Sequence, residues 1–149
     1  MSTQNMPPKA PAIPPRRVDA SDGTTDPSRA DQAPVALVVD DEPLVRRFVC
    51  AVLRREGWIV LEAADAIAAL AVARHASIDL VITDYEMPRV SGVTLAEQLR
   101  VSHRDLPVLV ISGHPDVDNK MRSLRGRAGF TRKPFAAAEL VSSVGALFG

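Results

Sequence analysis

The chain has 149 residues, enough for one domain, and its hydrophobic content of 46% can supply a core. Its 18 basic and 18 acidic residues cancel, so no overall charge steers the molecule toward nucleic acid or anionic lipid. A single cysteine excludes an internal disulfide and a cysteine-rich metal site. No apolar run approaches the roughly 20 residues of a membrane span, and the N-terminus lacks the apolar core of a secretory signal. We therefore expect a cytoplasmic location.

Residues 1–34 differ in composition from the rest of the chain. They contain seven of the twelve prolines, no aromatic residue, and four basic against four acidic side chains. Such a stretch cannot bury enough apolar surface to offset the entropy lost on ordering. We expect a disordered, partly polyproline-like tail that serves as a spacer or a partner-docking segment, followed by one domain over residues 35–149.

Strand-like and helix-like patterns alternate along residues 35–149, which is typical of βαβ units around a parallel sheet. In chain order we expect a strand at 35–40, a helix from Pro43 to the break at Gly57, a strand at 58–62, a helix at 65–76, a strand at 78–83, a helix at 92–102, a strand at 107–112, a helix from Pro115 to Arg125, a strand at 129–132 and a helix at 136–148. Right-handed crossovers place helices on both faces, so the fold class is a doubly wound α/β sheet.

The apolar spacing also predicts which helix residues face the core. In the first helix these are Leu44, Val45, Phe48, Val49, Val52 and Leu53, with Cys50 as a small buried neighbour. In the second helix they are Ile67, Leu70 and Ala71, and in the fifth they are Leu140, Val144 and Leu147.

Four of the expected strands run into polar residues that are useful in phosphoryl chemistry. They lead into Asp40-Asp41-Glu42, Asp84, Ser112 and Lys133 respectively. Because the carboxyl ends of parallel strands share one edge, and open α/β sheets place their sites at that edge, we expect these side chains to converge.

The acidic residues indicate a metal ion. Acids at a helix start ordinarily complement the helix dipole, but this does not account for Asp84 at the end of a different strand. Clustered carboxylates repel one another unless a cation lies among them, and hard oxygen ligands suit Mg²⁺. We therefore expect Mg²⁺ as the cofactor.

The residues that follow the later strands support this interpretation. Pro88 and Gly92 after Asp84 are suitable for a tight loop, and a hydroxyl at Ser112 can bond a phosphoryl oxygen. Lys133 precedes a proline, and X-Pro bonds are the ones commonly found cis. We expect a cis turn that aims the ammonium group inward.

Taken together, these motifs resemble the receiver domain of two-component response regulators. The resemblance rests on Val38-Val39-Asp40-Asp41-Glu42, Asp84-Tyr85-Glu86-Met87-Pro88 with Gly92, Ser112-Gly113, and Phe130-Thr131-Arg132-Lys133-Pro134-Phe135. It covers essentially all of residues 35–149 and implies a flavodoxin-like strand order of 2-1-3-4-5.

The resemblance also implies roles for individual residues. Asp84 is the implied phosphoacceptor, and the donor is a phosphohistidine on a sensor histidine kinase or a histidine phosphotransfer protein. Asp41, Asp84 and the backbone carbonyl of Glu86 would ligate Mg²⁺, with Asp40 acting through water or by orienting the metal. Lys133 would neutralise the transferring group.

The same resemblance implies a switch and an output surface. Ser112 would move toward the phosphoryl group while Phe130 swings inward, and the fourth helix, fifth strand and fifth helix would carry the signal. Glu86 and His114 stand where the family varies and could approach the water that hydrolyses the acyl phosphate; the preferred interpretation of His114 is an exposed loop residue and not a catalytic base. The cations Lys120, Arg122, Arg125, Arg127 and Arg132 form a solvated face or bind an acidic protein, and not nucleic acid.

We expect a stand-alone, single-domain receiver, monomeric or weakly dimeric, with no catalysis beyond its own phosphotransfer and autodephosphorylation. A partner of a hybrid kinase, a phosphorelay component or a phosphate sink fits the same motifs. Two alternatives remain. One is an aspartate-nucleophile phosphatase of the haloacid-dehalogenase type, which needs a second acid two residues after the nucleophile, a position that Glu86 occupies here. The other is a degenerate receiver used only for binding.

Overall fold

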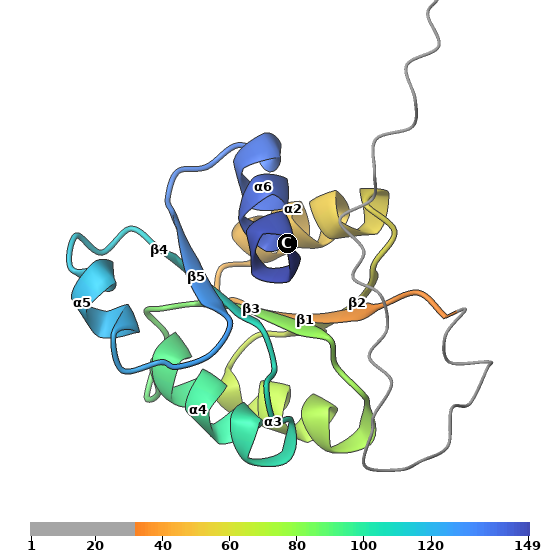
Figure 1. Cartoon of the computed structure of the whole chain (residues 1–149), viewed down its shortest axis with the longest axis horizontal. Helices are drawn as coiled ribbons and strands as arrows, with labels where there is room; N and C mark the ends of the chain where they lie inside the picture. Colours follow the sequence, from red (N-terminus) through yellow and green to blue (C-terminus); the bar gives the residue numbers. More distant parts are fainter. Residues whose placement is uncertain (1–31) are drawn as a thin grey trace, which may run out of the picture.

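Five parallel strands form the centre of the molecule, in the order β2-β1-β3-β4-β5 (Figure 1). They are β1 (Val35–Val39), β2 (Ile59–Ala63), β3 (Leu80–Asp84), β4 (Val108–Ser112) and β5 (Ala128–Arg132). The computed structural model describes residues 32–149, so residues 1–31 of the tail predicted for residues 1–34 lie outside the described residues. The doubly wound α/β fold and its 2-1-3-4-5 strand order are confirmed.

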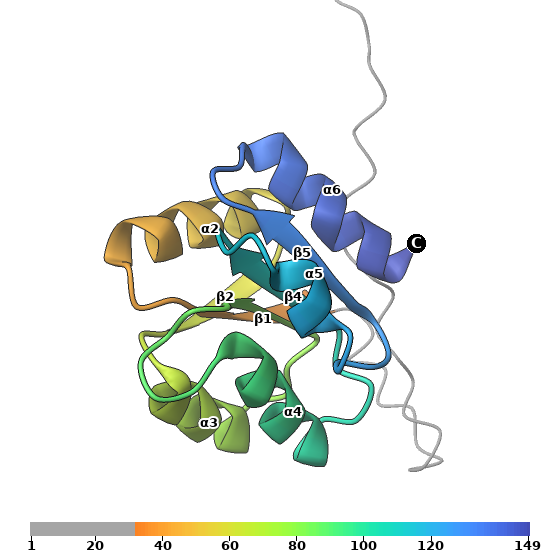
Figure 2. The same ribbon diagram turned by 90° about the vertical axis from the view of Figure 1, so that its left-hand side faces the viewer.

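Helices cover both faces of the sheet. They are α2 (Pro43–Arg55), α3 (Ala66–His75), α4 (Gly92–Ser102), α5 (Val117–Met121) and α6 (Ala137–Phe148). Figures 1 and 2 show α2 and α6 on one face and α3 and α4 on the other. Among residues 32–149, no helix is long and apolar enough to cross a membrane.

The strands are apolar on both sides because both faces of the sheet are covered. In β1, Leu37 and Val39 belong to the core that includes residues of α3 and α4, whereas Ala36 and Val38 belong to the core that includes residues of α2 and α6. Successive side chains of a strand point to opposite faces, so one short strand supplies both cores.

Two predicted helix faces were wrong in part. Leu44 and Phe48 of α2 are 77% and 40% exposed, and the buried face of this helix is formed by Val49, Cys50, Val52 and Leu53. Ile67 of α3 is 64% exposed, and Ala71 is exposed as well. The α3 face that packs on the sheet consists of Ala66, Ala69 and Ala73. Spacing alone favoured the larger apolar residues, but a face of small residues lets the helix approach the sheet closely.

The helix predicted from Pro115 to Arg125 was also wrong in length, because α5 ends at Met121. The amide of Leu124 bonds back to the carbonyl of Met121, three residues earlier, so the chain tightens into a turn. The carbonyl of Arg125 accepts a hydrogen bond from the Arg100 guanidinium of α4. These bonds replace the helical pattern and shape the connection to β5.

Candidate functional site

Three carboxylates meet at the carboxyl edge of the sheet. Asp40 and Asp41 directly follow β1, and Asp84 is the last residue of β3. The register pairs Val39 with Thr83, so the two strands deliver Asp40 and Asp84 at the same height. One oxygen from each of the three carboxylates lies within 4.8 Å of the others. Asp40 and Asp84 are buried, whereas Asp41 is exposed.

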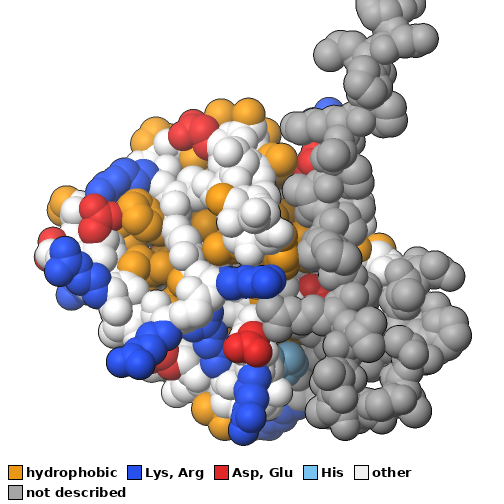
Figure 3. Space-filling model, viewed as in Figure 1, with side chains coloured by type: hydrophobic (Ala, Val, Ile, Leu, Met, Phe, Trp, Pro, Cys, Tyr) orange, Lys and Arg blue, Asp and Glu red, His pale blue; other side chains and the backbone are white. Residues whose placement is uncertain are grey.

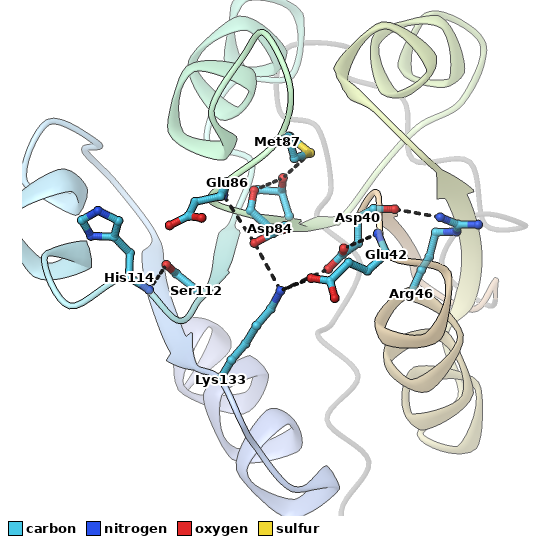
Figure 4. A network of polar contacts seen from close by, with 10 residues as sticks. Asp40, Glu42, Arg46, Asp84, Glu86, Met87, Ser112, His114 and Lys133 are labelled. Carbon is cyan, nitrogen blue, oxygen red and sulfur yellow. Dashed lines mark hydrogen bonds and ion pairs between the residues drawn. The ribbon is translucent and has the colours of Figure 1, made fainter.

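Lys133 reaches this cluster from the loop after β5 (Figure 4). Its Nζ atom lies 3.1 Å from Oε1 of Glu42, 3.5 Å from Oδ1 of Asp84 and 3.9 Å from Oδ2 of Asp40. The Lys133 amide donates to the carbonyl of Ser112 at 3.0 Å, which ties this loop to the end of β4. The Lys133–Pro134 peptide bond is cis, as predicted from the sequence.

Burial and mutual repulsion set the charge state of the cluster. Burial, and then the charge of Asp40, raises the pKa of Asp84 to about 6, although Lys133 and the Glu86 amide act in the opposite direction. Burial likewise raises the pKa of Asp40. Burial would lower the pKa of Lys133, but its hydrogen bond to Glu42 and the charges of Asp84 and Asp40 outweigh this and raise it. The site therefore contains more negative charge than Lys133 alone can stabilise.

The residues present fit a divalent cation. Oδ1 of Asp40 accepts a hydrogen bond from the Glu42 amide at 2.9 Å. Oδ2 of Asp40 is buried and accepts no hydrogen bond within the described part of the chain. A buried carboxylate oxygen that accepts no hydrogen bond is costly, and a cation held by this oxygen set would reduce the cost. Three carboxylates with an open side match the few protein ligands that Mg²⁺ takes.

The loop after β3 holds Asp84 in place. The Tyr85 amide donates to the carbonyl of Ile111 at 2.8 Å, and the Gly92 amide donates to the carbonyl of Tyr85 at 2.9 Å. A Cβ atom on Gly92 would overlap the backbone oxygen of Asp84, so this close approach requires glycine. The Glu86 amide lies 3.4 Å from Oδ1 of Asp84. Ligation of a metal by the Glu86 carbonyl stays a prediction.

Ser112 lies at the same edge and is buried. Its Oγ atom accepts a hydrogen bond from the His114 amide at 2.8 Å, which leaves the hydroxyl proton available to another acceptor. The His114 ring stands edge-on to Tyr85, with ring centroids 5.9 Å apart. Phe130 is half-buried on β5, and the Arg132 guanidinium lies 5.6 Å from its ring centroid.

Sequence reasoning missed two contacts of the site. The first is the Glu42–Lys133 ion pair, because Glu42 counted only as a third acid beside Asp40 and Asp41. The second is Arg46, whose Nη1 atom donates to the backbone carbonyl of Asp40 at 2.7 Å. An arginine five residues after Asp41, on the first turns of a helix, was the available signal. A contact with a backbone carbonyl leaves no pattern in side-chain chemistry.

The predicted cationic residues do not all share one environment. Arg132 pairs with Asp118 at 3.6 Å. The others, Lys120, Arg122, Arg125 and Arg127, are exposed, and none forms an ion pair with a described residue. In Figure 3, blue side chains are spread over the side of the molecule where Figure 1 shows α5 and α4.

The fold, the acid cluster and the lysine together define a receiver domain. The chain belongs to the response regulator receiver domain family, whose model matches residues 36–145. Receiver domains bind Mg²⁺ at an acidic cluster, act as phosphoacceptor modules in signalling and interact with histidine kinases.

Several known proteins are similar to this chain. A probable transcriptional regulatory protein of Mycobacterium tuberculosis, TcrX, is 38% identical over 121 residues, which are 80% of this chain and 52% of the relative. The sensor kinase CckA of Brucella abortus is 33% identical over 138 residues, covering 78% of this chain and 14% of the kinase. The chain thus spans about half the length of the curated regulators it matches, and much less of the kinases.

Solved structures agree with the family. The chemotaxis protein CheY4 of Vibrio cholerae superimposes with a TM-score of 0.71 at 28% identity, covering 76% of this chain and 98% of CheY4. The receiver domain of the hybrid histidine kinase CckA gives a TM-score of 0.66 at 34% identity, covering 77% of this chain and 99% of that domain.

Proposed function

We propose that this receiver accepts a phosphoryl group on Asp84, in a Mg²⁺-dependent reaction, from a phosphohistidine on a sensor histidine kinase or a histidine phosphotransfer protein. The observation that carries the proposal is the position of Asp84. Its carboxylate is buried beside two further aspartates, with Lys133 at 3.5 Å. Asp40 is buried in the same cluster, but its Oδ2 atom lies farther from Nζ of Lys133, at 3.9 Å.

In the proposed reaction, an oxygen of Asp84 attacks phosphorus in line with the donor imidazole. The new O–P bond forms as the P–N bond of the phosphohistidine breaks, and an aspartyl phosphate results. Asp84 must be ionised to attack, and a pKa of about 6 leaves most of it ionised at neutral pH. A bound Mg²⁺ would neutralise charge on the phosphoryl oxygens.

The chain's own residues position the group and offset its charge, which is the main requirement of phosphoryl transfer. Asp41, Asp84 and the carbonyl of Glu86 would hold Mg²⁺, with Asp40 orienting it. The Lys133 ammonium lies close to both Glu42 and Asp84. Once its ion pair with Glu42 breaks, it could bond a phosphoryl oxygen on Asp84. The free hydroxyl proton of Ser112 would donate to a second phosphoryl oxygen.

The signal would then pass from Ser112 to Phe130 on the neighbouring strand. Phe130 is half-buried and packs against the core that includes α4, so an inward movement would bury the part of its side chain that is now exposed. The surface formed by α5, β5 and α6 would present the change to a target. The single-domain form stays a prediction. The relatives include a transcriptional regulatory protein and a sensor kinase, so the role of partner of a hybrid kinase stays an alternative, as does the phosphate sink.

Incubation with acetyl phosphate and Mg²⁺, followed by intact-mass measurement, tests the proposal. We expect one phosphoryl group per chain, no label on Asp84→Asn, and retained label on the control variant Asp118→Asn. Full labelling of Asp84→Asn would assign the acceptor elsewhere. Repeated turnover of a small phosphate ester would support a phosphatase instead of a receiver.

A further inference from the structure

Arg46 connects the end of β1 to β2 from the first turns of α2. Its Nη1 atom donates to the backbone carbonyl of Asp40 at 2.7 Å, and its Nε atom donates to Oε1 of Glu62 at 3.2 Å (Figure 4 shows the first bond). The Arg46 side chain is only 20% exposed. A partly buried, charge-assisted hydrogen bond of this length is stronger than a neutral one.

The contacts of Asp40 account for all but one of its polar atoms. Its amide donates to the carbonyl of Ala63 at 3.2 Å, its Oδ1 atom accepts from the Glu42 amide, and its carbonyl accepts from Arg46. These three bonds come from β2, from the β1–α2 loop and from α2. Oδ2 accepts no hydrogen bond from a described residue; it is buried in the acid cluster, with Nζ of Lys133 3.9 Å away.

We propose that Arg46 is a positioning residue for the acid pair. It fixes the peptide after Asp40, so that Oδ2 of Asp40 and the carboxylate of Asp41 already face Asp84 before a cation binds. The inference rests on the proposed Mg²⁺ site. It assigns a role in metal binding to a side chain that offers the metal no ligand.

Charge alone would give Arg46 the opposite effect. Glu62 offsets part of its charge, and the other oxygen of Glu62 pairs with Arg54 at 3.4 Å. The remaining positive charge near three carboxylates would repel a divalent cation. Removal of Arg46 therefore tightens Mg²⁺ binding if charge dominates, and weakens it if positioning dominates.

Isothermal titration of Mg²⁺ shows whether removal of Arg46 weakens or tightens Mg²⁺ binding. It is carried out on four full-length proteins: wild type, Arg46→Met, Arg46→Lys and the control Arg54→Met. We expect Arg46→Met to weaken binding about tenfold, as for other residues that orient metal ligands. Arg46→Lys should also weaken binding, because one ammonium cannot replace a two-pronged guanidinium. Arg54→Met shares the Glu62 contact but not the Asp40 contact, and its affinity should stay within about twofold. Unchanged or tighter binding by Arg46→Met overturns the inference.

Amide hydrogen exchange in the metal-free protein separates this inference from the proposed function. The Glu42 amide, which bonds Oδ1 of Asp40, should exchange faster in Arg46→Met than in wild type or Arg54→Met. If the wild type binds no Mg²⁺, the proposed function is wrong. If the Glu42 amide exchanges at the same rate in all the proteins, the positioning role of Arg46 is wrong. If Arg46→Met does not fold, Arg46→Lys and Glu62→Gln provide the test, and wild-type affinity in both would contradict the inference.

Discussion

Lys133 makes its shortest ion pair with Glu42, at 3.1 Å, and not with the proposed phosphoacceptor. The Glu42 side chain is 60% exposed, whereas that of Asp84 is 6% exposed. The ammonium is therefore shared between a solvent-facing acid and a buried one. A phosphoryl group on Asp84 would compete with Glu42 for Lys133 through added charge.

This sharing predicts different effects for the two partners. Lys133→Ala should slow labelling by acetyl phosphate by at least about tenfold, because a cation that stabilises the transferring group is lost. Glu42→Gln should label at the wild-type rate or faster, because Lys133 is released toward Asp84. The initial rate of mass increase at saturating Mg²⁺ measures both. A loss in Glu42→Gln equal to that in Lys133→Ala would make Glu42 a required part of the site.

Asp84→Asn should stabilise the metal-free protein. The folded pKa of Asp84 lies near 6, above the ordinary value of 3.8, so the folded state binds the proton more tightly than the unfolded state. Stability from this group is present below about pH 4 and is lost as the pH rises through about 6. At pH 7.5 an uncharged asparagine should raise the free energy of unfolding by about 2 kcal/mol.

Urea unfolding in EDTA, at pH 7.5 and at pH 4, checks this prediction. The difference between Asp84→Asn and wild type should shrink at the lower pH, where wild-type Asp84 is protonated. Asp118→Asn is the control, since its carboxylate is 62% exposed on the surface. A variant that is destabilised at pH 7.5 would mean that contacts of the carboxylate outweigh its burial and repulsion.

Gly92→Ala should destabilise the protein and disturb the site. The added Cβ would overlap the backbone oxygen of Asp84 and lie 3.0 Å from Cγ2 of Thr83, so the loop after β3 must shift. We expect a loss of about 2 kcal/mol or more in thermal or urea unfolding, together with slower labelling.

Gly145→Ala is the matched control, because a Cβ there meets nothing within 4 Å and the position lies inside α6. Alanine should stabilise this helix by about 0.5–1 kcal/mol and leave labelling unchanged. Equal effects of the two substitutions would contradict the steric explanation for Gly92.

Cys50 should resist alkylation in the folded protein. Its side chain is 1% exposed, and burial, together with the charge of Glu62, raises the pKa of the thiol to about 11. Since the thiolate is the nucleophile, iodoacetamide at pH 8 should label the unfolded chain in urea and leave the folded chain unlabelled, as measured by intact mass. Labelling of the folded protein at the rate of a free thiol would show that α2 opens readily.

The apolar patterns of the sequence predicted the order of the strands and helices. The errors in helix length and in buried helix faces have physical causes. The strands were found within about two residues because short apolar runs bounded by turns leave few alternatives. The helix predicted from Pro115 to Arg125 was too long: α5 ends at Met121, the chain then turns, and Arg100, far away in the sequence, donates to the carbonyl of Arg125. Ile67 was placed inside because apolar spacing does not reveal that the face packed on the sheet consists of alanines.

The sequence by itself determined the alternation of strands and helices and the chemistry of the residues that follow the strands. Covalent order fixes which residue ends each strand, and parallel pairing brings those ends to one edge. Only the tertiary structure decided how these groups share their contacts. Three features depend on distances between separate elements: the pairing of Lys133 with Glu42, the lack of a hydrogen bond to Oδ2 of Asp40, and the bond from Arg46 to a backbone carbonyl. Such distances follow from how the helices pack on the sheet, which local patterns do not encode.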